Sequence, residues 1–335
     1  MKYETYKIVV NNPNKISENN IKQEIRKERS YLDINFSSTQ VKKEIRHHNN
    51  QRFFSLFKPT KDKAFIKELN YHAAIILPNY YISSFGSICN ALKKVNGKVI
   101  EEITASMIAE NKKSQIYQDY HTTLSKEEAF NSFYDALYSY NGNPNFNQEL
   151  IPDWLRNISY YHNETGILDV KGDVRAYIYE KDDVLTIAFT GTQPATRIES
   201  VIADIIQLFD QSYLYALASG LLHLALEKKD YKKVKVIGHS LGGGLCQFSV
   251  LTNSDPKVQG ICFNSAGLSA TTLEYIDENE LMNAKQYLHH FITLHDVVSK
   301  FGAIVGSVVF LPEVGKALHS LESLKPCLEE YYNIT

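Results

Sequence analysis

The sequence predicts an α/β protein, with a mostly parallel central sheet covered by helices and an additional, mainly helical N-terminal region. Beyond residue 170, short β-branched runs alternate with longer helical patterns, which is typical of parallel sheets. Glycine-rich turns follow the strand-like runs, and the carboxyl ends of parallel strands are where functional sites are built. With 335 residues, 44% of them hydrophobic, the chain can form a substantial core, which excludes a disordered or fibrous protein.

The expected elements follow one another in order along the chain. Residues 127–140 carry apolar side chains three and four positions apart, as a helix does, and Asn141-Gly-Asn-Pro ends it. Helices are also expected over residues 198–228 and 241–251. Strands are expected over 175–180, 184–190, 233–238, 258–264 and 289–295.

The charge distribution separates the N-terminal region from the rest. Residues 1–70 hold 15 Lys and Arg against 8 Asp and Glu, although the whole chain has a net charge of −2. We therefore divide the chain into a basic, mainly helical and loop region, 1–125, and an α/β domain, 126–335. The basic segment could bind anionic lipid headgroups or a partner protein, or it could be a solvated helical face. The overall balance of positive and negative charges gives no reason to expect a nucleic-acid partner.

The cysteines and the apolar runs indicate in which cellular compartment the protein is expected. The four cysteines lie far apart with no CxxC pair, which argues against a zinc site or a dense disulfide framework. The N-terminus lacks the apolar stretch of a signal peptide, and the most apolar runs, 214–226 and 302–311, are too short or interrupted to cross a bilayer. We expect a cytoplasmic protein in the producing cell, with signal-independent export left open.

A nucleophile is predicted where a strand meets a helix. Gly238-His-Ser240-Leu-Gly242 is a GxSxG pentapeptide between an apolar strand and the helix expected over 241–251. That context is typical of a nucleophile elbow, whose flanking glycines let strand and helix approach closely. The alternative is a glycine-rich turn with an incidental serine.

A serine nucleophile needs a histidine base and a carboxylate, which follow it in this type of sheet. Asp296 comes directly after an expected strand, and His319 follows 23 residues later, where a base is expected. Three other histidines lie in or at the end of the strand that leads to Asp296, namely His289, His290 and His295. To act as the base, each ring would have to bend back past the Asp296 carboxylate. His239 flanks the nucleophile and is expected to point away from it as a packing residue.

Two further groups complete the predicted site. The oxyanion hole is expected to use the backbone N–H of Leu241 and the turn at Thr192, although an ordinary strand-ending turn is the alternative there. The apolar run 302–311 lies between acid and base. We expect part of it to line an acyl-chain groove or form a mobile flap, with core packing as the alternative, and the best candidates are Val308, Val309 and Phe310.

These residues resemble a known family. The segments Phe189-Thr-Gly-Thr192, Gly238-His-Ser-Leu-Gly-Gly243, Leu294-His-Asp296-Val-Val and Leu318-His-Ser-Leu-Glu322 resemble class 3 lipases, which are fungal-lipase-like α/β-hydrolases, over residues 126–335. The closer resemblance is to a bacterial phospholipase-like branch. It implies an α/β-hydrolase fold, a triad of Ser240, Asp296 and His319, an oxyanion hydroxyl at Thr192, and no cofactor or metal.

Two departures from the family pattern favour phospholipid over triglyceride. Thr190 stands where members usually have Arg, and the Gly-x-Pro-Arg-x-Gly motif of secreted lipases is absent. The resemblance thus implies a phospholipase A1-type acyl hydrolase that forms an acyl-enzyme at a membrane surface. It could be a delivered antibacterial effector with an immunity protein as its inhibitor. The alternatives are a small-ester hydrolase or acyltransferase, and a catalytically idle binding module, although the intact Ser, Asp and His argue against idleness.

Overall fold

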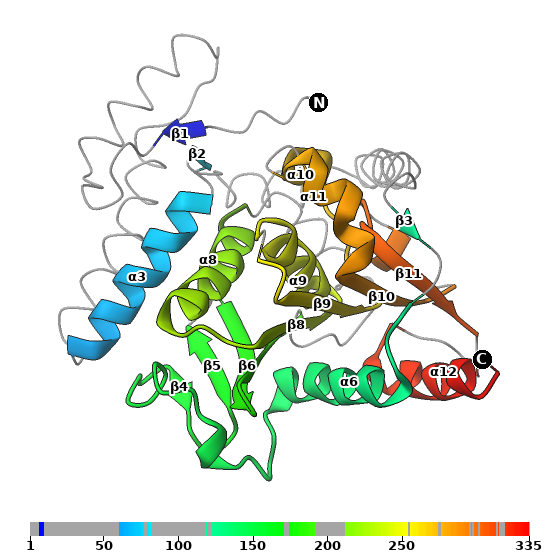
Figure 1. The fold of residues 1–335 in the computed structure, drawn as a ribbon, viewed down its shortest axis with the longest axis horizontal. Coiled ribbons are helices and arrows are strands. Elements are labelled where there is room, and N and C mark those ends of the chain that lie inside the picture. Colours follow the sequence, from blue (N-terminus) through cyan, green and yellow to red (C-terminus); the bar gives the residue numbers. More distant parts are fainter. Residues whose placement is uncertain are drawn as a thin grey trace, which may run out of the picture.

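The computed structural model describes residues 7–9, 60–76, 79–81, 118–119, 122–170, 174–191 and 212–334, apart from 254, 274–275, 295, 297, 301, 313 and 315–318. At its centre is a nine-stranded sheet in the order β3-β11-β10-β9-β8-β7-β6-β5-β4 (Figure 1). Its strands are β3 (Gln118–Asp119), β4 (Tyr161–His162), β5 (Ile167–Val170), β6 (Val174–Lys181), β7 (Val184–Phe189), β8 (Lys233–His239), β9 (Val258–Phe263), β10 (Leu288–Thr293) and β11 (Gly306–Leu311). A separate pair joins β1 (Lys7–Val9) to β2 (Asn79–Tyr81).

The sheet is mostly parallel, as the sequence predicts. From β7 through β8, β9, β10 and β11 to β3, each neighbouring pair is parallel. The strands β4, β5, β6 and β7 form an antiparallel meander at the other edge. The strands β7 to β10 are buried along nearly their whole length, as parallel strands covered by helices on both faces must be.

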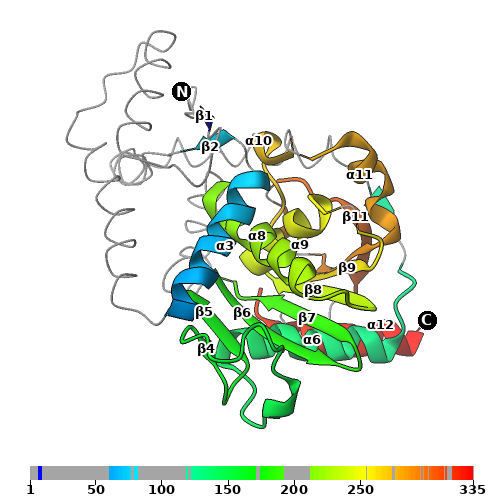
Figure 2. The same ribbon diagram turned by 60° about the vertical axis from the view of Figure 1, so that its left-hand side comes forward.

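Helices cover both faces of the sheet. On one face, α6 (Lys126–Asn141) and α12 (Leu321–Ile334) lie side by side, and α8 (Ser212–Lys228) and α9 (Leu241–Leu251) lie on the other (Figures 1 and 2). Short helices fill the connections: η4 (Gln148–Leu150), α10 (Ala270–Leu273), α11 (Glu278–Asn283), η5 (Ala284–Gln286) and η6 (Val298–Lys300). In the part of the chain described, every helix is too short or too polar to cross a membrane.

One helix of the predicted N-terminal region packs directly on the α/β domain. This helix, α3 (Thr60–Ile76), lies along α8, at a crossing where a Cβ on Gly220 would meet the backbone nitrogen of Ala73 at 2.7 Å. Its buried Asp62 carboxylate accepts a hydrogen bond of 2.7 Å from the backbone N–H of Ser159. Thus α3 belongs to the same packed body as α8. Most of the basic segment 1–70 lies outside the described residues.

The helix and strand bounds agree with the predicted ones except at a few ends. The helix α6 begins after Ser125, whose hydroxyl accepts from the N–H of Glu128, and it ends at Gly142, where φ is 77°. The strand expected to reach residue 295 ends at Thr293, because the chain turns there and the N–H of Asp296 donates to the Thr293 carbonyl. Within the expected helix 198–228, the described part is α8.

The structure corrects the expectation for the run 302–311. Its second half is β11, a strand that pairs with β10 and, at its start, with β3. Val308 and Val309 are 1% and 3% exposed and belong to a paired strand, so they are not part of a mobile flap, and their burial agrees with the alternative of core packing. Apolar residues on both faces of a covered parallel strand are buried by the layers on either side. Phe310 differs, because 49% of its surface is exposed.

Candidate active site

Ser240 lies in the sharp turn between β8 and α9, where its backbone adopts φ 59° and ψ −128°. A non-glycine residue with such a positive φ is strained, and this strain places the side chain at the carboxyl edge of the sheet. The residues two positions before and after Ser240 must be glycines, because neighbouring backbone atoms approach them closely. A Cβ on Gly238 would lie 2.0 Å from the carbonyl oxygen of Gly242, and a Cβ on Gly242 would lie 2.2 Å from that of Phe189.

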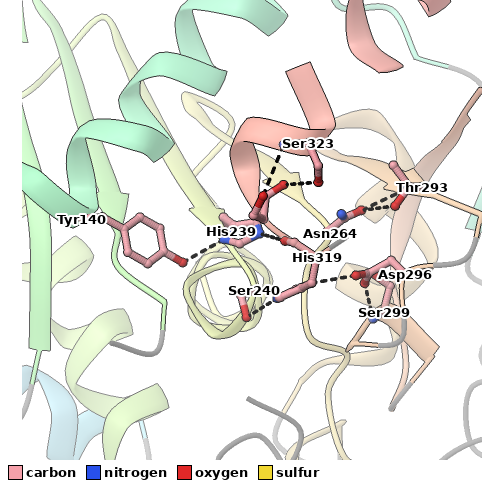
Figure 3. Close-up of polar contacts among 10 residues, drawn as sticks. Tyr140, His239, Ser240, Asn264, Thr293, Asp296, Ser299, His319 and Ser323 are labelled. Atoms are coloured by element: carbon pink, nitrogen blue, oxygen red, sulfur yellow. Dashed lines mark hydrogen bonds and ion pairs between the residues drawn. The ribbon is translucent and has the colours of Figure 1, made fainter. Parts of the chain in front are cut away.

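The structure brings together the three side chains predicted as a triad. The Nε2 atom of His319 lies 2.7 Å from the hydroxyl oxygen of Ser240, and its Nδ1 atom lies 2.6 Å from Oδ1 of Asp296 (Figure 3). Because the carboxylate accepts a hydrogen bond from Nδ1–H, the Nε2 lone pair of neutral His319 faces the Ser240 hydroxyl. Ser240 and Asp296 are each 3% exposed, so the chain of hydrogen bonds is shielded from bulk water.

A second residue holds the Asp296 carboxylate in place. The backbone N–H and the hydroxyl of Ser299 both donate to Oδ2, at 2.7 and 2.6 Å. Burial alone would raise the pKa of Asp296, but hydrogen bonds from His319 and Ser299 outweigh it and keep this pKa below the usual value. Asp296 is therefore ionised at neutral pH and can stabilise a positive charge on His319. Nothing in the sequence pointed to Ser299.

The histidines of β10 bond to groups other than Ser240. The Nδ1 atom of His289 lies 3.3 Å from the hydroxyl of Thr122, whereas His290 bonds to Ser265 and to the carbonyl of Val305. Burial lowers the pKa of His289 to about 4 and that of His290 to about 3. Both are thus neutral packing residues of the sheet, and His295 lies outside the described residues.

His239 packs against His319, a neighbour that the sequence did not predict. Its ring stacks on that of His319, with centroids 4.7 Å apart and planes inclined by 29°. Its Nε2 atom contacts the backbone carbonyl of His319, and its Nδ1 atom contacts the hydroxyl of Tyr140, both at 2.8 Å. The side chain therefore points toward His319. Adjacency to Ser240 was the only sequence signal for this contact, and none existed for Tyr140.

The residues assigned to the oxyanion hole are only partly described. Leu241 is the first residue of α9, and N–H groups in the first turn of a helix have no acceptor within it. Thr192 lies outside the described residues. Before it, the Thr190 hydroxyl donates to the carbonyl of Ser139 at 2.6 Å, so this threonine joins the end of β7 to α6. No group of three or more His, Cys, Asp or Glu in the described segments could hold a metal ion.

The sheet and the order of these residues define the class of protein. A strained serine turn follows a central parallel strand, and an Asp and a His come later at the same edge. This is the α/β-hydrolase fold, and the prediction of that fold is confirmed.

Residues 132–305 match the sequence model of a phospholipase-like family, which is described as a Tle-like phospholipase domain. Since the match covers 174 of the 335 residues, the chain belongs to this family, as a lipid ester hydrolase of lipase or phospholipase type. The predicted resemblance to the phospholipase-like branch is confirmed. The match includes Ser240 and Asp296, whereas His319 lies beyond it. No protein with curated annotation matches the chain.

Solved lipase structures are also similar, at low identity. Lip2 lipase from Yarrowia lipolytica is 15% identical over 61% of this chain and 86% of its own, with a TM-score of 0.38. A triacylglycerol lipase from Penicillium expansum is 12% identical over 51% and 70%, with a TM-score of 0.29. The Rhizomucor miehei lipase propeptide complex is 14% identical over 61% and 64%, also with a TM-score of 0.29.

Proposed function

We propose that the chain is a phospholipase A1-type acyl hydrolase, which cleaves the sn-1 ester of a phospholipid through an acyl-enzyme on Ser240. The observation that carries this proposal is the hydrogen-bonded series from Ser240 through His319 to Asp296, on a strained turn of an α/β-hydrolase sheet. Membership of a phospholipase-like family supports a phospholipid substrate. The choice of the sn-1 bond comes from the family resemblance.

In the first half of the reaction, the Ser240 oxygen attacks the ester carbonyl carbon while Nε2 of His319 takes the hydroxyl proton. The ionised Asp296 carboxylate holds Nδ1–H and stabilises the imidazolium that forms. The negative oxygen of the tetrahedral intermediate accepts a hydrogen bond from the Leu241 N–H, where the positive end of the α9 dipole adds to the attraction. Thr192 is the proposed second donor.

In the second half, the intermediate collapses and the bond to the leaving alcohol breaks. The imidazolium of His319 gives its proton to that alcohol, which departs as a lysophospholipid, and the acyl group stays on Ser240. A water molecule then attacks the acyl-enzyme while His319 takes its proton. As this second intermediate collapses, the bond to Ser240 breaks, the imidazolium returns the proton to the Ser240 oxygen, and the fatty acid leaves. No cofactor is needed for either half.

A phospholipid with different acyl chains at its two ester positions tests this proposal. Mass spectrometry of the products should find the sn-1 fatty acid and the matching lysophospholipid with the wild type, and neither with Ser240→Ala. Release of the sn-2 chain would contradict the A1 assignment. Faster turnover of short soluble esters, or esters of an added alcohol as the main product, would favour the small-ester hydrolase or the acyltransferase.

A fluorophosphonate probe distinguishes the enzyme from a catalytically idle module, because it labels only an activated serine. Labelling of the wild type and not of Ser240→Ala is expected. The role of a delivered effector with an immunity protein remains a proposal drawn from the resemblance. If the chain is such an effector, directing the wild type to the bacterial periplasm should stop growth while Ser240→Ala should not.

A further inference from the structure

Both ring nitrogens of His239 have partners, and the chemistry of those partners fixes where its proton lies. A carbonyl oxygen can only accept, so the contact of Nε2 with the His319 carbonyl requires the proton on Nε2. Nδ1 is then an acceptor, and the hydroxyl of Tyr140 donates to it. Burial, together with the repulsion that a charged His319 would exert, lowers the pKa of His239 to about 3. The ring is therefore neutral at any pH at which a histidine base can work.

The series of hydrogen bonds continues beyond Tyr140. Its hydroxyl also receives a hydrogen bond from the backbone N–H of Gly191, at the end of β7. A Cβ on Gly191 would lie 2.2 Å from that hydroxyl oxygen, so only glycine allows the contact. Gly191 directly precedes Thr192, the proposed oxyanion donor. One series of hydrogen bonds thus links the backbone beside the oxyanion turn to the backbone of the proposed base.

Tyr140 itself is held from the opposite side. It lies in the last turn of α6, and its carbonyl accepts a hydrogen bond of 3.1 Å from the guanidinium of Arg175. The same guanidinium forms an ion pair with Asp169 at 2.8 Å. The helix α6 and the antiparallel part of the sheet therefore both fix the position of Tyr140. Its phenol points toward His239 (Figure 3).

The stacked rings give His239 a second way to restrain the base. His319 is held at Nδ1 by Asp296 and at Nε2 by Ser240, while His239 covers one face of the ring and binds the backbone carbonyl. These contacts fix the ring plane and the backbone together. Neutrality matters, because a charged imidazole at this distance would repel the imidazolium that forms during attack.

We propose that His239 and Tyr140 are positioning residues, which fix the ring of His319 and the Gly191 backbone as one unit. This inference rests on the proposed function, since it needs His319 to act as a base. Neither side chain has to touch the substrate. Misplacement of a reacting group by about 1 Å can cost on the order of a hundredfold in rate, so a small relaxation of this unit should be measurable.

Three variants test the proposal. Tyr140→Phe removes only the hydroxyl, His239→Phe keeps a stacked ring without its hydrogen bonds, and His239→Gln can still donate to the His319 carbonyl. On a soluble short-chain ester, kcat should fall roughly 3- to 30-fold for Tyr140→Phe and roughly 10- to 100-fold for His239→Phe, with KM within about twofold. His239→Gln should recover part of the loss. The double Phe variant should lose less than the product of the two single losses, because both side chains act in one series.

The chain offers matched controls for loss of stability. His290 has the same arrangement as His239: a hydroxyl contacts Nδ1, a carbonyl contacts Nε2, and burial lowers its pKa to about 3. Tyr161 is a buried tyrosine whose hydroxyl donates to the Ile178 carbonyl at 2.6 Å. His290→Phe and Tyr161→Phe should lower the melting temperature as much as the test variants but leave kcat of the folded protein unchanged.

Unchanged kcat in folded Tyr140→Phe and His239→Phe would overturn the proposal, and so would an equal loss in the controls. If His239→Phe does not fold, the comparison of Tyr140→Phe with Tyr161→Phe decides. The rate of fluorophosphonate labelling of Ser240 gives a second readout, which should fall in parallel with kcat. A wild type that neither labels nor hydrolyses would instead contradict the proposed function itself.

Discussion

The imidazole of His319 lies 2.7 Å from the hydroxyl of Ser240, although 79 residues separate them in the sequence. The parallel arrangement accounts for this, because β8, β9 and β10 all end at the same edge of the sheet, and Ser240 and Asp296 follow two of them. His319 reaches that edge just before α12, which lies against the opposite face from α9. The geometry leads to five expectations that can be measured.

Ser240→Ala should lower kcat by on the order of 10⁴ or more, because the attacking oxygen is lost while the fold remains. The assay is hydrolysis of a short-chain ester together with fluorophosphonate labelling. Ser249→Ala is the matched control, since Ser249 is a buried serine of α9 whose hydroxyl donates to the Leu245 carbonyl. Comparable losses in both variants would mean that the Ser240 effect is structural.

Asp296→Asn should lower kcat by roughly 10³- to 10⁴-fold, because an amide favours the wrong tautomer of His319. Ser299→Ala should have a milder effect, about 3- to 10-fold, since the backbone N–H of Ser299 still holds the carboxylate. Losing that hydroxyl should also raise the pKa of Asp296, so the pH profile of kcat/KM distinguishes the two variants. Ser132→Ala, which removes a buried hydroxyl bonded to a helix carbonyl, should have no such effect.

Thr192→Val should lower kcat by roughly ten- to a thousandfold with little change in KM, because an oxyanion donor acts on charge that develops only in the transition state. Thr190→Val is the comparison, since its hydroxyl bonds to the Ser139 carbonyl and should affect the melting temperature more than kcat. An unchanged kcat in Thr192→Val would remove that residue from the oxyanion hole.

Val309→Asp should destabilise the protein by roughly 3 kcal/mol or more, because it buries an unpaired charge in β11. Hydrolysis of long-chain and short-chain esters should then fall equally. Phe310→Asp, at a half-exposed position of the same strand, should cost about 1 kcal/mol or less. The checks are thermal unfolding and the ratio of the two activities, and a normal melting temperature for Val309→Asp would contradict the core assignment.

Asp135 should make stability depend on pH. Burial raises the pKa of this carboxyl to about 7, although the Tyr179 hydroxyl and the charge of Lys235 oppose the shift. Between about pH 4 and 7 the folded protein keeps a proton that the unfolded chain has lost, so stability decreases as pH rises through this range. Asp135→Asn has no proton to lose, and it should be more stable than the wild type at pH 8 by on the order of 1–3 kcal/mol but nearly equal at pH 4.

Thermal unfolding of both proteins from pH 4 to pH 8 measures this difference. Asp153→Asn, at an exposed position whose carboxylate pairs with Arg156 on the surface, is the control and should follow the wild type. Parallel curves for the wild type and Asp135→Asn would contradict the prediction.

By itself the sequence determined the central strands, two of the helices that cover them, and the strand–turn–helix context of Ser240. Its periodicities predicted α6, α9 and the five strands β6 to β10 to within a residue or two, because alternation and spacing of apolar residues depend only on near neighbours. The GxSxG motif likewise predicted the close approach of strand and helix at Gly238 and Gly242. Chain order selected Asp296 and His319, the residues that the fold brings into hydrogen-bond contact with each other.

Only the tertiary structure decided the partners that come from distant elements. Ser299 bonds to Asp296 because the chain turns after β10, and Tyr140 reaches His239 because α6 packs against β7 and β8. Val308 and Val309 are buried because β11 pairs within the sheet, and an apolar run does not reveal this pairing by its composition. The partners of a hydrogen bond and the burial of a side chain depend on where the helices pack against the sheet. Packing over the entire domain fixes these contacts, and no local sequence pattern does.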